Sequence, residues 1–208
     1  MIAAISKFLL ILGSIFAAAQ LFRQPEKLTE QTKTFAMLIT LSLGFIAASA
    51  LGEILLSGES QDSQTMARLL TQLKIFIAIP LISSLITAAR FGYFFSRAAW
   101  GRWVLALFAM FELMRRMGLG VEYTQVLSVL CALSLLISLV SFRQPSIRNL
   151  GAGGALLISS SLLIYSKASL LPTHQHMPTE NLMMAAGLIF IGLACRHMIS
   201  YQQQKADS

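Results

Sequence analysis

Residues 34–56 read TFAMLITLSLGFIAASALGEILL, an apolar stretch in which Glu53 is the one charged side chain. A helix of about 20 apolar residues crosses the roughly 30 Å hydrocarbon core of a bilayer, so this stretch is long enough to span it. Its residues show none of the period-2 alternation that a strand of a membrane β-barrel requires. In hydrocarbon a helix satisfies its own backbone N–H and C=O groups. The stretch therefore predicts a transmembrane α-helix.

Similar apolar stretches recur along the whole chain and are separated by short polar loops. Of its 208 residues 56% are hydrophobic and 12% are charged, and the mean hydropathy is +0.70. A soluble domain carries about a quarter charged residues, so this chain has too little charge to coat a water-facing surface. We expect a single all-α domain over residues 1–208, a polytopic membrane bundle of seven helices. The predicted helices cover residues 3–22, 34–56, 67–89, 99–117, 123–142, 150–167 and 181–200.

Two of these helices admit a second interpretation. The first has Lys7 ahead of an apolar run and small residues near its end, as in a signal peptide. Its run is long and the next helix follows almost at once, so we interpret it as a retained span. In the fourth, the uninterrupted apolar stretch over residues 103–111 is short, and such a segment could lie in the membrane interface instead of crossing.

The basic residues are distributed unevenly over the predicted loops. With seven spans and the N-terminus outside, the inside segments hold Arg23, Lys27, Lys33, Arg90, Arg97, Arg102, Arg143, Arg148, Arg196 and Lys205. The outside segments hold Lys7, Arg68, Arg115, Arg116 and Lys167. This excess follows the positive-inside rule, and it predicts an outside N-terminus, a cytoplasmic C-terminus and a location in the cytoplasmic (inner) membrane.

The net charge of +7 does not indicate a nucleic-acid partner. The basic residues are scattered singly near helix ends, where they fix topology and meet anionic headgroups. No run of Lys and Arg with interleaved aromatics forms a nucleic-acid surface. The lipid bilayer is the expected partner, and a second membrane protein is the other one that the sequence allows.

Four charged side chains within the predicted spans are the strongest functional signal. Lys7, Glu53, Lys74 and Glu112 all fall in the outer third of the membrane. An ionisable group there is costly unless it finds a partner or water, so we expect Lys74 to lie close to Glu112 or Glu53. These four residues are the predicted solute or ion pathway, and Pro80 adds a helix interruption of the kind that lines transport sites. The alternative is structural: the lysines snorkel outward, and the carboxylates pair with them to fix helix register.

Catalytic and cofactor motifs are absent from the sequence. There is no GxSxG or HExxH motif and no glycine-rich phosphate loop. Cys131 and Cys195 are far apart and read as packing residues, and one histidine within a span cannot supply a paired haem site. The weak candidates for a metal site are His174, His176 and Met177 in the last outside loop, a donor set that suits copper. We expect no bound cofactor and no catalytic metal.

Three functions fit these features. The first is a transport or channel-like protein with a charged cavity in the outer third of the membrane. The second is a non-catalytic subunit or sensor of a larger membrane complex. The third, an intramembrane enzyme acting on lipid, depends only on Glu112 near Arg115 and Arg116, where a phosphate headgroup could dock.

Overall fold

A computed structural model describes residues 2–22, 30–56, 60–93, 95–166 and 175–206, and within these ranges every regular element is a helix. The predicted all-α class is confirmed, and each of the seven predicted helices is present. The helices are α1 (Ile2–Phe22), α2 (Glu30–Leu55), α3 (Gln61–Leu73), α4 (Ile79–Phe91), α5 (Arg97–Arg116), α6 (Gly120–Val140), α7 (Pro145–Ser160) and α8 (Met177–Ala206). Two π-helical turns complete them: η1 (Lys74–Ala78) joins α3 to α4, and η2 (Ser161–Tyr165) extends α7.

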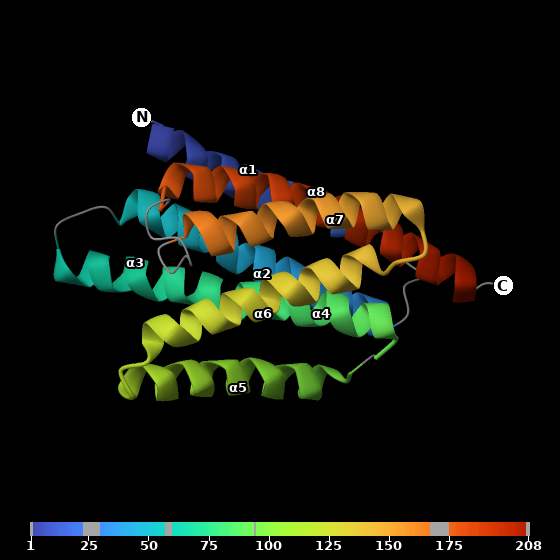
Figure 1. The fold of residues 1–208 in the computed structure, drawn as a ribbon, viewed down its shortest axis with the longest axis horizontal. Coiled ribbons are helices and arrows are strands. Elements are labelled where there is room, and N and C mark those ends of the chain that lie inside the picture. The colour runs from blue at the N-terminus through green and yellow to red at the C-terminus, as the bar shows by residue number, and fades with distance from the viewer. Residues whose placement is uncertain (1, 23–29, 57–59, 94, 167–174, 207–208) are drawn as a thin grey trace.

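Six helical segments of the described chain are long and apolar enough to cross a membrane. They are α1, α2, the continuous α3–η1–α4 helix, α6, α7 with η2, and α8. They lie along one common direction in Figure 1, so the chain folds as a polytopic membrane bundle.

The fourth predicted span, α5, is a helix but is not among those six. Arg102 and Glu112 flank its short apolar stretch, and only Trp100 and Leu107 are buried. Figure 1 nevertheless shows that the chain enters α5 where α4 stops and leaves it at the other end of the bundle, where α6 starts. Helix α5 therefore runs the length of the bundle, although its composition does not support a membrane span.

Helix α8 packs against α7 on one side and α1 on the other through small residues. A Cβ atom added to Gly154 on α7 would lie 2.9 Å from the carbonyl oxygen of Gly187 on α8. On the other side of α8, a Cβ on Gly192 would lie 2.8 Å from the Cα of Ala17 on α1. Such glycines let backbones approach closely, which is how membrane helices gain packing energy without a hydrophobic effect.

The π-helical turn η1 has its origin in Pro80. Proline lacks the N–H that would bond the carbonyl four residues earlier, so an α-helix is interrupted there. The N–H of Ile79 instead donates to the carbonyl of Lys74, which is five residues earlier. Such π-bulges are frequent at functional sites. Every residue from 76 to 83 is buried, so this irregular segment runs through the interior of the bundle.

Candidate functional site

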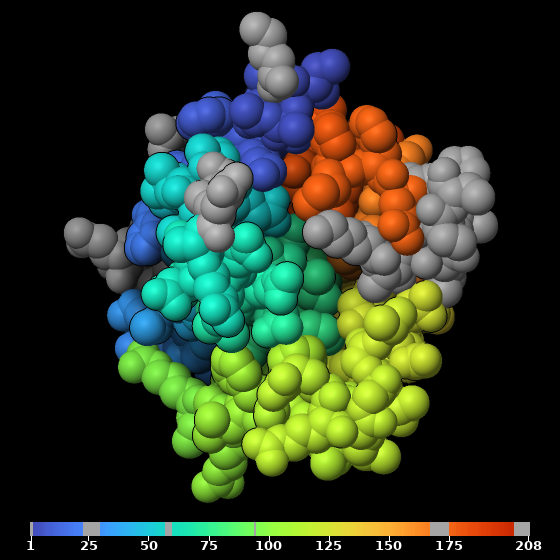
Figure 2. Space-filling model, turned by 90° about the vertical axis from the view of Figure 1, so that its left-hand side faces the viewer, coloured from blue at the N-terminus to red at the C-terminus, as the bar shows by residue number. Residues whose placement is uncertain are grey.

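A pocket of about 670 Å³ opens at one end of the bundle. This pocket end is where α1, α3, α6 and α8 begin, and it is the end that the sequence predicts to be outside. Figure 2 views the pocket end, with α3 in teal, the turn between α5 and α6 in yellow-green and the start of α8 in orange. Exposed residues form the mouth, among them Arg68, Arg115 and Met177, and buried residues form the floor, among them Lys74, Ser128 and Glu180.

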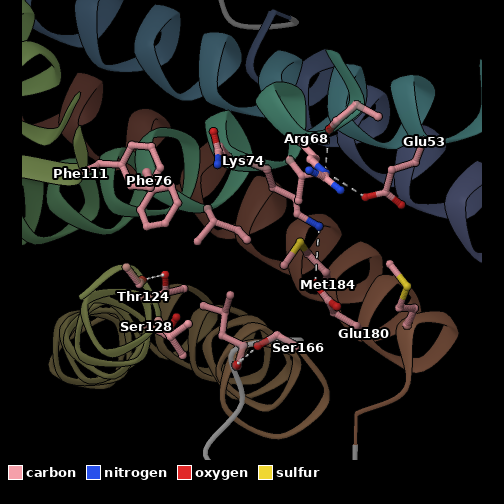
Figure 3. Close-up of a pocket in the computed structure, with 18 of the residues that line it drawn as sticks. Glu53, Arg68, Lys74, Phe76, Phe111, Thr124, Ser128, Ser166, Glu180 and Met184 are labelled. Carbon is pink, nitrogen blue, oxygen red and sulfur yellow. Dashed lines mark hydrogen bonds and ion pairs between the residues drawn. The ribbon is translucent and has the colours of Figure 1, made fainter. Parts of the chain in front are cut away.

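An ion pair lies at the floor of the pocket. The Nζ atom of Lys74 is 3.4 Å from Oε1 of Glu180, and the two side chains are 5% and 8% exposed. Lys74 comes from the first residue of η1 and Glu180 from the first turn of α8, as Figure 3 shows. The hydroxyl of Ser161 in η2 donates to the Glu180 carbonyl at 2.9 Å, so both π-helical turns contribute to this floor.

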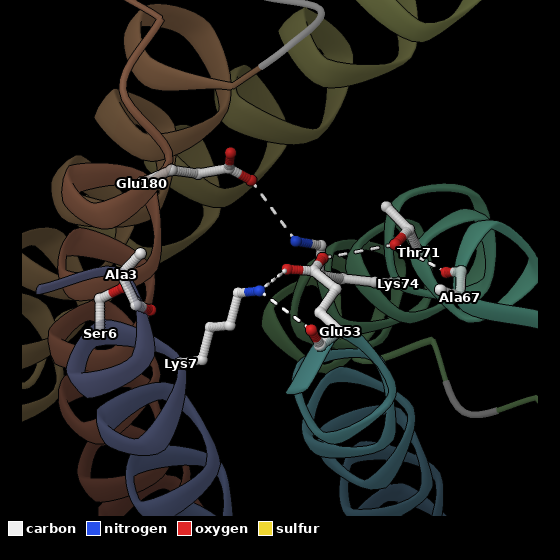
Figure 4. A network of polar contacts seen from close by, with 8 residues as sticks. All are labelled: Ala3, Ser6, Lys7, Glu53, Ala67, Thr71, Lys74 and Glu180. Atoms are coloured by element: carbon white, nitrogen blue, oxygen red, sulfur yellow. Dashed lines mark hydrogen bonds and ion pairs between the residues drawn. The ribbon is translucent and has the colours of Figure 1, made fainter. Parts of the chain in front are cut away.

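A second ion pair lies nearer the mouth. The Nζ atom of Lys7 on α1 is 3.5 Å from Oε2 of Glu53 on α2, and it also donates to the Glu53 backbone carbonyl at 3.1 Å. The hydroxyl of Thr71 on α3 donates to the other carboxylate oxygen of Glu53 at 3.4 Å. Figure 4 shows the two pairs next to each other, with Lys7 and Lys74 reaching toward different carboxylates. Three of the four predicted residues therefore line one pocket.

The fourth predicted residue, Glu112, lies outside the pocket wall, and Lys74 pairs with Glu180 instead of Glu112 or Glu53, the two partners that we expected. Its carboxylate accepts from Arg115 at 2.8 Å and from Arg116 at 2.9 Å, both on its own helix. Residues three and four positions apart lie on one face of a helix, so the two arginines satisfy Glu112 locally. Its side chain is 39% exposed and is not part of the pocket wall.

The partner of Lys74, Glu180, is a site residue that the sequence does not reveal. It precedes the predicted start of the last span at 181, which places it in the outside loop. In the structure α8 begins at Met177, and Glu180 is 6% exposed. The signal that could have found it is the carboxylate in the first turn of a helix, a position favoured by the helix dipole.

The remaining wall combines aromatic rings and hydroxyl groups. Phe76 of η1 stacks on Phe111 of α5 with ring centroids 3.9 Å apart, and this contact ties α5 to the pocket. Thr124 of α6 bonds back to its own helix at 2.7 Å, whereas the hydroxyl of Ser128, 6% exposed, has no partner within the described part of the chain. Its oxygen is not among the fully buried, unbonded hydroxyls of the described residues, which are those of Ser49 and Ser159, so Ser128 is accessible from the pocket and available to a bound molecule.

The pocket wall carries more basic than acidic groups. Its basic side chains are Lys7, Arg68, Lys74 and Arg115, and its carboxylates are Glu53 and Glu180. Both carboxylates are engaged by lysines, and Arg115 is engaged by Glu112 outside the wall. The arrangement favours a ligand with negative charge.

The weak metal candidates do not form a site in the part of the chain that the structure describes. His174 lies outside the described residues. His176 and Met177 are exposed, and Nδ1 of His176 is 2.7 Å from the hydroxyl of Thr179. No three His, Cys, Asp or Glu side chains of the described ranges come together as metal ligands.

Comparison with models of known protein families, with curated proteins and with solved structures gave no match.

Proposed function

We propose that this protein is a transport or channel-like protein of the cytoplasmic membrane, and that its pocket binds a small anionic solute. The observation that supports this most is the Lys74–Glu180 ion pair, which lies within a membrane bundle and yet forms the floor of a pocket. Ionisable side chains inside membrane bundles face cavities or partners and mark solute pathways. The basic excess of the wall supports an anion as the solute.

The geometry of the Lys74–Glu180 ion pair at the pocket floor favours a lysine that can exchange its partner for a bound anion over a permanent structural link between the helices. Lys74 has three donors and makes one polar contact with the described residues, at 3.4 Å, which is longer than the 2.7–2.9 Å typical of a strong charged hydrogen bond. An anion bound beside Lys74 and Ser128 would use donors that the folded protein leaves available. The aromatic wall of Phe76 and Phe111 would cover an apolar part of the same solute.

A thermal-shift assay with a panel of small anions tests this proposal. Phosphate, acetate, benzoate and glutamate would each be added to the purified protein in detergent, and the melting temperature recorded. We expect at least one anion to raise the melting temperature of the wild type by several degrees, since a ligand that binds only the folded state stabilises it. The control is Lys33→Gln, because Lys33 pairs with Glu30 at the opposite end, where its side chain is 48% exposed.

The test variant is Lys74→Met combined with Glu180→Leu, which removes the buried pair without leaving an unpaired charge. The proposal expects this variant to fold and to lose the anion-dependent shift. It is contradicted if no anion stabilises the wild type, or if the double variant keeps the shift. A required partner subunit found on copurification would favour a role as a subunit or sensor.

Orientation decides which compartment the pocket faces. The excess of basic residues at the end opposite the pocket predicts a cytoplasmic C-terminus and a pocket open to the outside. A reporter that is active only in the cytoplasm should therefore be active when fused after Ser208. Activity of an outside-only reporter at this position would contradict this orientation, and with the N-terminus still outside it would require an even number of spans.

A further inference from the structure

Hydroxyl side chains line the contact between α4 and α6 along almost its whole length. The α6 residues are Thr124, Ser128, Ser134 and Ser138, followed by Ser141 at its end, and the α4 residues are Ser83 and Thr87. Together with Cys131, the α6 positions recur at intervals of three or four residues, which places them on one face of the helix. We name these seven hydroxyl residues the hydroxyl seam.

The two helices exchange polar contacts across the seam. The hydroxyl of Ser83 donates to the backbone carbonyl of Cys131 at 3.5 Å. One turn further, the hydroxyl of Thr87 is 2.6 Å from that of Ser134 and 2.9 Å from that of Ser138. A hydroxyl both donates and accepts, and these contacts carry no charge, so one hydroxyl can replace another or a water molecule without a large penalty.

The seam connects the pocket to the opposite end of the bundle. Thr124 and Ser128 at one end are pocket-wall residues. At the other end Arg90 donates to the carbonyl of Ser141 at 2.8 Å and to its hydroxyl at 3.0 Å. From Lys74 to Arg90 the helix rises about 24 Å at 1.5 Å per residue, which is most of the roughly 30 Å of hydrocarbon.

The glycine-packed contacts of α8 leave no comparable route among the described residues. Between α7 and α8, and between α8 and α1, backbones approach so closely that an added methyl group would overlap its neighbour. Ser14 on α1 and Ser42 on α2 donate to carbonyls of their own helices, and Ser161 bonds across to α8 only at the pocket floor.

We infer that a solute bound in the pocket crosses the membrane along the hydroxyl seam, and that α4 and α6 separate to admit it while α1, α7 and α8 stay packed. This inference depends on the proposed function. Its physical basis is that hydroxyls of α4 and α6 bond to each other across this contact, between the pocket at one end and Arg90 at the other. The π-helical turn η1 supports it, because its Ile79 N–H to Lys74 carbonyl bond leaves an irregular segment at the start of α4 where the helix can bend.

Labelling of single cysteines by a charged, membrane-impermeant methanethiosulfonate tests the inference in reconstituted protein. The test position is Ser138→Cys, and the matched control is Ser14→Cys, in a background with Cys131→Ala and Cys195→Ala. Ser138 and Ser14 are equally buried at 1% exposure, so a static structure protects both alike. We expect Ser138→Cys to react at least about tenfold faster, because only the seam opens.

Equal, slow labelling at both positions would overturn the inference, provided that Ser138→Cys is folded. If Ser138→Cys does not fold, Thr87→Cys replaces it as the test position, because Thr87 faces the same seam. The anion panel on the same preparations separates the two proposals. Stabilisation by an anion without labelling contradicts the route alone, and labelling without stabilisation by any anion contradicts the proposed function.

Discussion

The two sides of this bundle are held together by opposite means. Between α7 and α8, Gly154 and Gly187 bring backbones into contact, and the packing leaves no room for an added atom. Between α4 and α6, the contact is made by hydroxyls such as Thr87 and Ser138, which touch through exchangeable hydrogen bonds. Close packing of small residues fixes a membrane interface, whereas polar contacts tolerate rearrangement and water. The comparison indicates which part of the bundle is a scaffold and which part is able to open.

The largest expected effect comes from disturbing the scaffold at Gly154. Gly154→Leu should push α7 away from α8, since even a Cβ atom would lie 2.9 Å from the carbonyl oxygen of Gly187 and from a side-chain carbon of Ile191. Overpacking of this kind costs about 1–3 kcal/mol or more, so the melting temperature in detergent should fall sharply.

The control for this prediction is the adjacent glycine. A Cβ atom added to Gly153 would have no neighbouring atom within 4 Å, so Gly153→Leu should change the melting temperature little. If the two variants lose the same stability, the α7–α8 contact is not the rigid part of the molecule.

An intermediate effect is expected at the two lysines of the pocket. Lys74→Leu leaves Glu180 buried without a partner, and breaking a buried ion pair costs about 3–5 kcal/mol. Lys7→Leu should cost much less, because the Lys7 side chain is 21% exposed and Thr71 still donates to Glu53. Denaturation followed by circular dichroism would compare them. Equal losses would show that burial in the pocket floor does not distinguish the two pairs.

The smallest expected effect on stability is in the hydroxyl seam. Ser138→Ala removes one hydrogen bond to Thr87, and such bonds in membrane proteins contribute about 0.6 kcal/mol on average. Ser160→Ala is the control, because that hydroxyl is bonded only to its own helix at Leu156. Both variants should melt close to the wild type. If the melting temperature of Ser138→Ala alone falls by many degrees, the hydrogen bonds of the seam hold α4 and α6 together and do not allow them to separate easily.

Much of the fold follows from hydropathy alone. Apolar stretches such as residues 34–56 are long enough that their helical state is dictated by the backbone's need for internal hydrogen bonds. Helix α5 shows where this reasoning weakens, because its charged flanks leave a short apolar centre, and only the course of the chain places it along the bundle.

The depth of the charged site residues in the membrane was predictable from the sequence, but their ion-pair partners were not. The positions of Lys7, Glu53 and Lys74 along their helices place all three near one end, and the structure brings them to one pocket. Glu112 lies at a similar depth, but depth says nothing about which way a side chain points around its helix. The spacing of three and four residues between Glu112 and the arginines Arg115 and Arg116 does indicate a local pair on one helix face, and our expectation gave that spacing too little weight.

Hydrogen–deuterium exchange in nanodiscs tests the central comparison most directly. Amide protection would be compared between peptides covering residues 79–91 and 128–140, which carry the seam, and peptides covering residues 150–160 and 184–195, which carry the glycine contacts. If α4 and α6 separate while the scaffold stays closed, the seam peptides should exchange at least about tenfold faster, as expected for a region with a lower opening free energy. Equal protection of the two sets, or faster exchange in the glycine-packed peptides, would contradict the account.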